Sequence, residues 1–285
     1  MNETQSVTIL SRRFPAKRAF VTGAASGLGR AIATELAEAG WRLGLLDVSA
    51  GRLVEVERTL REAGATTHSY AGDVAQEGFV AGSVADFAQR AGGLDLMVNN
   101  AGVAAGGSIE ATPAADWRWI IDINLLGVVW GCQAAVPLMR AARAGLVLNV
   151  ASAAGFAASP QMSAYNATKA AVISLSETLA AELEGSGVQA AVAMPGFFAT
   201  RLLEAMRAPP QESAMAQQLM ANSRHDAAAA ARAILEAAAR GDLHIVWPRE
   251  YRLAWRLKRL FPGWFVRRVA QLRGRQPARA NPRPG

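Results

Sequence analysis

The sequence predicts an α/β fold built on a doubly wound, mostly parallel sheet, with a basic amphipathic helical extension at the C-terminus. Three observations predict it. Short apolar segments alternate with longer helix-like stretches, a glycine-rich turn follows the first short segment, and positive charge is concentrated at one end of the chain. Consecutive parallel strands need a crossover, so this alternation is typical of βαβ units.

Seven short apolar segments have the length and composition of strands. They are Arg18–Thr22, Arg42–Leu46, Thr66–Tyr70, Leu94–Val98, Leu146–Val150, Val188–Met194 and His244–Trp247. Right-handed crossovers between them place helices on both faces of the sheet.

Helices are predicted where apolar residues recur at three- and four-residue spacing. These stretches are Leu28–Ala39, Arg52–Ala63, Phe79–Arg90, Asp116–Arg143 and Ala164–Glu184, and the alanine-rich Ala227–Ala239 is an ordinary helix rather than a linker. Glycines that follow helical patterns are expected to end them in the left-handed conformation, namely Gly40, Gly64, Gly145 and Gly187.

Length and composition indicate one domain with an appendage, since 285 residues with 51% hydrophobic content can bury a full core. We expect a loose polar arm at residues 1–16, a main domain at 17–248, a helical tail at 249–274 and disorder at 275–285. The arm contains no continuous apolar run, so neither a secretory signal nor a membrane span is visible there. Cys132 is the only cysteine, and a cytoplasmic protein is the default expectation.

The net charge of +7 is unevenly distributed along the chain. Residues 244–285 carry eleven Lys and Arg and one acid, a formal +10, whereas the first 243 residues carry −3. The tail also interleaves aromatic and aliphatic residues with its arginines, and Pro262-Gly263 is expected to divide it into two short helices. Its apolar side either docks on the domain or a partner subunit, or contacts an anionic membrane. The charge also suits a nucleic-acid binder, but no such fold motif is visible and we expect no nucleic acid.

The glycine-rich turn Thr22-Gly23-Ala24-Ala25-Ser26-Gly27-Leu28-Gly29 lies between the first strand and the first helix. Glycine lets the backbone turn sharply and approach a pyrophosphate, which the amides of the following helix face. The turn therefore predicts a dinucleotide site and makes 17–248 a dinucleotide-binding domain, the alternative being a turn without a ligand.

Asp47 ends the second strand, eighteen residues after Gly29. An acid there hydrogen-bonds the adenosine ribose and repels a 2′-phosphate, so it favours NAD, with NADP as the less favoured cofactor. The alternative is that Asp47 caps the helix that begins near Ala50. Arg30 and Arg42 are close enough in sequence to leave the cofactor choice open.

Tyr165 and Lys169 stand four apart in a helical pattern, so their side chains can meet on one face. An adjacent ammonium stabilises a phenolate, which predicts a lowered tyrosine pKa and a proton-transfer pair. Ser152 follows the strand Leu146–Val150, at the edge where open α/β sheets bind ligands. Its hydroxyl can hold a substrate oxygen beside the phenol, although a serine at a turn or cap is the alternative.

With these residues the chain resembles the short-chain dehydrogenase/reductase family, in its single-domain branch, over approximately residues 16–247. The resemblance implies a Rossmann fold, a metal-free site and hydride transfer between NAD and an alcohol or carbonyl carbon. It implies that Tyr165 is the acid/base, that Ser152 positions the oxygen and that Lys169 binds the nicotinamide ribose. It also implies further site residues, which are Asn124 in the proton relay, Asp73 and Val74 at the adenine, Asn100, Ala101 and Gly102 after the fourth strand, and Pro195, Gly196, Phe198 and Thr200 at the nicotinamide. Phe198 departs from the pattern, since the family more often has a small β-branched residue there.

The predicted substrate is an apolar alcohol or ketone, because the segment from Ala153 to Ser163 contains no charged residue. Arg201 is the nearby charge that could contradict this. The resemblance implies a homodimer or homotetramer built on Asp116–Arg143 and Ala164–Glu184, and Ile120–Leu138 is apolar on more than one face. A non-catalytic NAD-binding regulator is the other hypothesis, although it would not need a proton relay.

Overall fold

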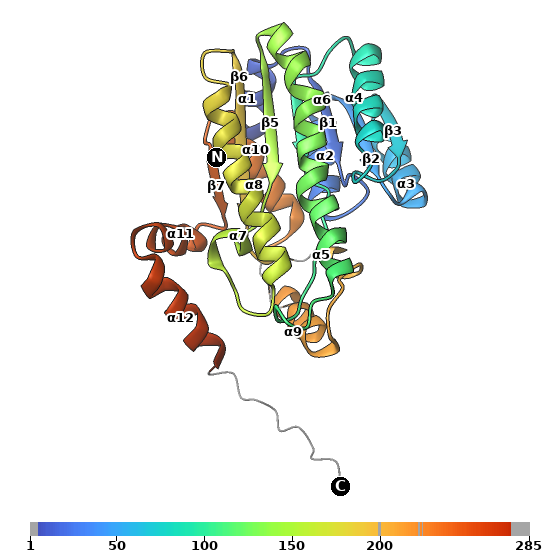
Figure 1. Ribbon diagram of the computed structural model, residues 1–285. Coiled ribbons are helices and arrows are strands. Elements are labelled where there is room, and N and C mark those ends of the chain that lie inside the picture. The colour runs from blue at the N-terminus through green and yellow to red at the C-terminus, as the bar shows by residue number, and fades with distance from the viewer. Residues whose placement is uncertain (1–4, 199–200, 222, 224, 275–285) are drawn as a thin grey trace.

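Seven parallel strands form one sheet in the computed structural model, which describes residues 5–198, 201–221, 223 and 225–274 (Figure 1). They are β1 (Arg18–Thr22), β2 (Arg42–Asp47), β3 (Thr67–Ala71), β4 (Leu96–Asn99), β5 (Gly145–Val150), β6 (Val188–Pro195) and β7 (His244–Trp247). Their spatial order is β3-β2-β1-β4-β5-β6-β7, so the winding reverses between β1 and β4. The predicted doubly wound parallel sheet is confirmed, with strand ends within two residues of those expected.

The helices cover both faces of the sheet. The α-helices of the described residues are α1 (Gln5–Arg13), α2 (Gly27–Glu38), α3 (Ala50–Glu62), α4 (Glu77–Ala91), α5 (Ala114–Ile121), α6 (Gly127–Ala142), α7 (Ala154–Ala157), α8 (Ser163–Glu182), α9 (Pro210–Ala221), α10 (Ala227–Ala239), α11 (Glu250–Leu260) and α12 (Pro262–Gly274), with a 3-10 turn η2 (Arg201–Leu203). Side chains of α1, α2, α3 and α10 pack one core, and those of α4, α6 and α8 pack the other. Covering on both faces explains why β4 and β5 are buried along their whole length.

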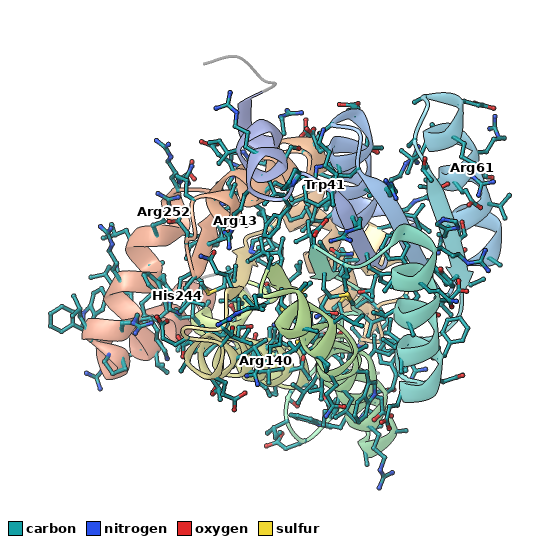
Figure 2. The ribbon with its side chains drawn as sticks, turned by 90° about the horizontal axis from the view of Figure 1, so that it is seen from above. Arg13, Trp41, Arg61, Arg140, His244 and Arg252 are labelled. Atoms are coloured by element: carbon teal, nitrogen blue, oxygen red, sulfur yellow. The ribbon has the colours of Figure 1, made fainter. Side chains whose placement is uncertain are left out.

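The N-terminal segment is a helix docked on the domain, and the prediction of a loose polar arm was wrong for this part of it. Leu10 and Phe14 are buried in the core with Trp41, and the Trp41 indole Nε1 donates to Ser11 Oγ at 3.0 Å. Figure 2 shows Trp41 beside the N-terminal helix α1. A search for a continuous apolar run misses Leu10 in α1 and Phe14 directly after it, which lie four apart and are joined by the hydrogen bond from Phe14 N to Leu10 O. Residues 1–4 lie outside the described part.

The predicted helix Asp116–Arg143 is one continuous helical rod in three parts: α5, a π-helical turn η1 (Asp122–Leu126) and α6. By length and composition alone, Ala114–Ala142 could cross a membrane. Helix α6 packs against α4, β4 and β5, so part of this apolar surface belongs to the core.

Three of the four predicted helix-ending glycines have positive φ, namely Gly40, Gly64 and Gly187. Gly145 does not, because it is the first residue of β5. The left-handed residue after α6 is Arg143, with φ of 51°.

The tail forms two helices that meet at Pro262, as predicted. Helix α11 docks on the domain, where Tyr251, Ala254 and Trp255 pack against the core on the α8 side of the sheet. Helix α12 extends beyond the body of the molecule and packs mainly on α11 (Figure 1). Docking is therefore confirmed for α11, whereas the predicted disorder of 275–285 lies outside the described residues.

Candidate active site

A cavity of about 660 Å³ opens at the carboxyl ends of the strands. Its walls come from the turn after β1, the ends of β2, β4, β5 and β6, helix α8, the segment 201–205 and the first turn of α11. Because the winding reverses between β1 and β4, the loops after these strands diverge and leave a crevice there.

The β1–α2 turn is held by hydrogen bonds from the next strand of the sheet. Thr22 Oγ1 accepts from Asn100 N and Ala101 N, both at 3.0 Å, and Asn100 Nδ2 donates to Thr22 O at 2.9 Å. A Cβ added to Gly29 would lie 2.1 Å from Gly23 O, so only glycine permits this approach of α2 to the turn. Gly23, Ser26, Gly27 and Leu28 line the cavity, and the turn fits the pyrophosphate of a dinucleotide.

Asp47 lies in the cavity wall with both carboxylate oxygens engaged. Oδ2 accepts from Ala25 N at 3.0 Å, and Oδ1 accepts from Ser49 N at 2.9 Å. The acid thus ties the β1–α2 turn to the loop after β2. The residue that precedes α3 as its N-cap is Ser49, so Asp47 is not the cap of that helix.

Asp73 and Val74 form the neighbouring part of the wall, after β3. Val74 is buried, and Asp73 Oδ1 accepts from Ala75 N at 2.9 Å, which fixes this loop against the cavity. The loop after β4 continues the wall with Asn100, Ala101 and Gly102.

Ser152, Tyr165 and Lys169 meet in the cavity, although Ser152 comes from the loop after β5 and the other two from α8. Ser152 Oγ accepts from Ala154 N at 3.1 Å and donates to Pro195 O at 3.4 Å. Lys169 Nζ donates to Val150 O at 3.0 Å and lies 5.8 Å from the centre of the Tyr165 ring.

Burial governs the proton affinities of these groups. Loss of water raises the pKa of the Tyr165 phenol, and a hydrogen bond with Ser152 acts in the opposite direction. Burial lowers the pKa of Lys169 to about 8. A lowered tyrosine pKa was predicted from the adjacent ammonium, and this prediction is wrong. The ammonium is bonded to a backbone carbonyl, and desolvation of the phenol dominates.

Asn124 lies behind the cavity in the π-helical turn and is fully buried. Its Oδ1 accepts from Val103 N at 2.8 Å and its Nδ2 donates to Val103 O at 2.9 Å, so it fixes the loop after β4. A Cβ on Gly102 would lie 3.2 Å from Asn124 Oδ1 and 3.3 Å from Lys169 Nζ. Asn124 and Lys169 thus flank the same glycine, and a water-linked relay between them stays a prediction.

The segment after β6 contributes Pro195, Gly196 and Phe198 to the cavity. Phe198 is buried edge-on against Trp247, with ring centres 5.7 Å apart, so the core accommodates its larger side chain. Thr200, the remaining predicted residue here, lies outside the described residues.

Tyr251 is a cavity residue that the sequence did not reveal. It lies in the first turn of α11, and a Cβ on Gly196 would approach its ring carbon Cε2 to 2.6 Å. Aromatic residues recur throughout the tail, so no local signal distinguishes this one.

Two charged residues also line the cavity without having been predicted. Arg52 Nη1 from α3 pairs with Glu204 Oε2 at 3.1 Å, and Glu204 Oε1 in turn accepts from Arg201 Nε at 2.8 Å. The Arg52–Glu204 pair joins the residue after η2 to α3, the helix that follows Asp47. Arg52 lies five residues after Asp47, in the first turn of α3, and this position could have indicated it as a cavity residue.

The end of the cavity beyond Ser152 and Tyr165 is mainly apolar. It is walled by Trp119, Ala154, Ala157, Met162, Phe197, Leu202 and Leu203. Arg201, whose charge could have contradicted an apolar substrate, is already paired with Glu204. Of the predicted residues in the described part, Thr22, Gly29 and Asn124 do not line the cavity but support residues that do.

Known proteins are similar to this chain in sequence and in fold. The family described as short chain dehydrogenase matches residues 17–211. The 2-(R)-hydroxypropyl-CoM dehydrogenase of Xanthobacter autotrophicus is 36% identical over 65% of this chain and 76% of its own. The D-beta-hydroxybutyrate dehydrogenase of Rhizobium meliloti is 38% identical over 66% of this chain and 74% of its own.

A solved structure extends the similarity beyond these aligned segments. A short-chain dehydrogenase/reductase from Burkholderia phymatum, in complex with NAD, superposes with a TM-score of 0.82 at 32% identity. The superposition covers 86% of this chain and 93% of the Burkholderia phymatum chain.

Proposed function

Because this chain belongs to the short-chain dehydrogenase/reductase family, we propose that it is an NAD-dependent oxidoreductase that interconverts an apolar alcohol and its carbonyl compound. The observation that carries the proposal is the convergence of Ser152, Tyr165 and Lys169 on a cavity whose other end is the glycine turn. Related chains named for hydroxypropyl and hydroxybutyrate substrates support chemistry at a CH–OH carbon.

The protein's own residues handle the oxygen and its proton. The glycine-rich turn and Lys169 would hold NAD, which would supply the hydride acceptor for the substrate carbon. Ser152 holds the substrate oxygen, and Tyr165 takes the hydroxyl proton as the C=O bond forms. Because the alcohol loses a proton together with a hydride, the carbonyl product is uncharged at this group. Lys169 stabilises the phenolate and binds the nicotinamide ribose, while Asn124 fixes the loop beside the ammonium.

The proton-transfer role is tested by Tyr165→Phe, with Tyr70→Phe as the matched control because the Tyr70 hydroxyl bonds Asp86 on α4. We expect Tyr165→Phe to lower kcat by at least about 100-fold and to leave NAD affinity nearly unchanged, since the phenolic proton serves the chemistry. Retention of more than about a tenth of kcat would remove Tyr165 as the acid/base.

The preference for NAD is proposed from Asp47, whose carboxylate faces the part of the cavity between the glycine turn and α3. The nearby guanidinium of Arg52 is paired with Glu204, which reduces its attraction for a 2′-phosphate. Titration with both dinucleotides should give a much lower Kd for NAD than for NADP. Asp47→Ala should reduce this difference in Kd, whereas the control Glu184→Ala, at an exposed position, should leave it unchanged. Equal or tighter NADP binding by the unmodified protein would contradict the proposal.

The substrate class is proposed from the apolar walls around Trp119, Met162 and Leu202. A panel of secondary alcohols of increasing chain length, followed by NADH absorbance, should show kcat/KM rising with apolar chain length. A clear preference for short, charged hydroxy acids would overturn this part of the proposal. NAD binding with no turnover across the panel and with ketones plus NADH would instead favour a non-catalytic NAD-binding regulator.

We propose a homodimer or homotetramer in the cytoplasm, built on the helical rod Ala114–Ala142 and on α8. Leu138 on this rod is 38% exposed, and Trp130 and Val136 are half-buried, which supports burial of this side against a second copy. Light scattering at micromolar concentration should give a mass at least twice 30.0 kDa. A monomer mass would refute the assembly and leave the catalytic proposal standing.

A further inference from the structure

The helices α11 and α12 form a hairpin, residues 250–274, with one docked side and one exposed side. Tyr251, Ala254 and Trp255 pack on the domain, and Arg259 lies over the Trp255 ring at 5.0 Å. Away from this contact, large apolar side chains face solvent, with Leu260 exposed by 70% and Phe261 by 57%. The other members of this exposed set are Leu253, Trp264 and Val266.

The hairpin is also strongly basic. Between Glu250 and Val269 its basic residues are Arg252, Arg256, Lys258, Arg259, Arg267 and Arg268, and Glu250 is its only acid. Arg259 lies 3.6 Å from Glu177, but Arg256, Arg267 and Arg268 have no carboxylate within ion-pair distance in the described part of the chain. Exposed apolar and cationic side chains therefore lie together on the same two helices.

We propose that this surface of the hairpin binds an anionic phospholipid bilayer. Exposed aliphatic and aromatic side chains need an apolar phase, and an interfacial Trp with flanking arginines suits the headgroup region, where arginine stems can also cover apolar surface. An anionic headgroup layer supplies negatively charged partners for Arg256, Arg267 and Arg268.

Two other occupants fit these observations less well. A second hairpin in a symmetric contact would bring Arg256, Arg267 and Arg268 of both copies together, and like charges in a contact disfavour it. Nucleic acid would satisfy the arginines but offers no apolar phase for Leu260 and Phe261.

The position of the hairpin relates it to the cavity. Tyr251 of α11 lies in the cavity wall, and α12 continues from α11 past the edge where the strands end (Figure 1). A bilayer bound at the hairpin would thus lie near the cavity, which suits an apolar substrate. The lipid-binding proposal does not depend on catalysis, because its test needs neither cofactor nor substrate.

The test is co-sedimentation of the full chain with vesicles of phosphatidylcholine plus phosphatidylglycerol, compared with phosphatidylcholine alone. We expect binding to the anionic vesicles that weakens as salt is raised to about 1 M, where the screening length falls to about 3 Å. The double variant Arg267→Glu/Arg268→Glu should bind at least roughly 25-fold more weakly, at about fivefold for each basic residue lost. Arg12→Glu, an exposed position on α1, is the matched control and should change binding little.

The apolar contribution is tested by Phe261→Ser/Trp264→Ser, which should weaken binding by about tenfold or more. The control Val54→Ser/Ile109→Ser removes two exposed apolar side chains elsewhere. Unchanged melting temperature and gel-filtration volume will show that each variant is folded, and the salt and lipid dependence of the unmodified protein test the proposal without any variant.

Equal binding to neutral vesicles, or losses as large in the controls as in the hairpin variants, would overturn the proposal. Tighter binding to a DNA duplex than to anionic vesicles would assign the surface to nucleic acid instead. Absence of vesicle binding together with a drop in oligomer mass in Phe261→Ser/Trp264→Ser would assign it to a second copy.

Discussion

Replacing Lys169 by methionine is expected to remove a pH dependence from the free energy of unfolding. Lys169 is 4% exposed, and its Nζ donates to Val150 O at 3.0 Å. Burial lowers its pKa from 10.5 to about 8. Methionine has a similar unbranched length and no charge, so it removes the titration with little change in packing.

The sign of the effect follows from which state holds the proton more tightly. The pKa of Lys169 is lower in the folded state, so the unfolded chain binds more protons between pH 8 and 10.5, and stability rises with pH across this window. Below pH 8 the ammonium is present in both states, and its burial costs the folded state about 3 kcal/mol at 1.36 kcal/mol per pKa unit. Between pH 7 and 9 the wild type should therefore gain roughly 1 kcal/mol relative to Lys169→Met.

Urea denaturation of the cofactor-free proteins at pH 7, 8 and 9 measures this difference. Lys17→Met is the matched control, since the Lys17 ammonium bonds Ala39 O at the end of α2 rather than lying in the cavity. A difference between wild type and Lys169→Met that stays constant from pH 7 to 9, or that moves in the opposite direction, would refute the reasoning.

Three further predictions concern packing around the site. Gly29→Ala should cost about 1–3 kcal/mol of stability and weaken NAD binding, because its Cβ would lie 2.1 Å from Gly23 O. The control Gly82→Ala on α4, whose Cβ would meet nothing within 4 Å, should be neutral or stabilising. The two variants are compared by Tm and by the calorimetric Kd for NAD, and equal losses would contradict the turn geometry. Tyr251→Ala should open the cavity and raise kcat/KM for the longest alcohols of the panel relative to the shortest; an unchanged ratio would remove this residue from the substrate wall. Phe14→Ala should lower the free energy of unfolding by about 3–5 kcal/mol, and a change under 1 kcal/mol in urea would show that α1 is not docked.

Local patterns were enough for the strands, most helices and the glycine-rich turn between β1 and α2. Glycines that must turn sharply, an acid at a strand end and Tyr165 four residues before Lys169 are constraints that act over a few residues, so they are visible in the chain itself. The parallel sheet covered on both faces also followed, because right-handed crossovers leave few ways to connect alternating strands and helices, whereas the strand order was established by the structure.

The docking of α1 could not be read from the sequence. Its helix presents only a narrow apolar stripe, and Leu10 and Phe14 become core residues because Trp41 and α10 leave a matching surface. The ion pair between Arg52 and Glu204 likewise depends on the approach of two segments 152 positions apart.

The sequence by itself determined the fold class and the position of the glycine-rich turn, and it predicted the set Ser152, Tyr165 and Lys169 that the structure brings to one cavity, because periodicity and turn chemistry are local properties. Only the tertiary structure decided that burial raises the pKa of Tyr165 and that Tyr251 enters the cavity wall. It also decided which side of the basic tail is docked and which side is exposed. Desolvation and packing depend on what surrounds a side chain in space, and distant segments supply those surroundings.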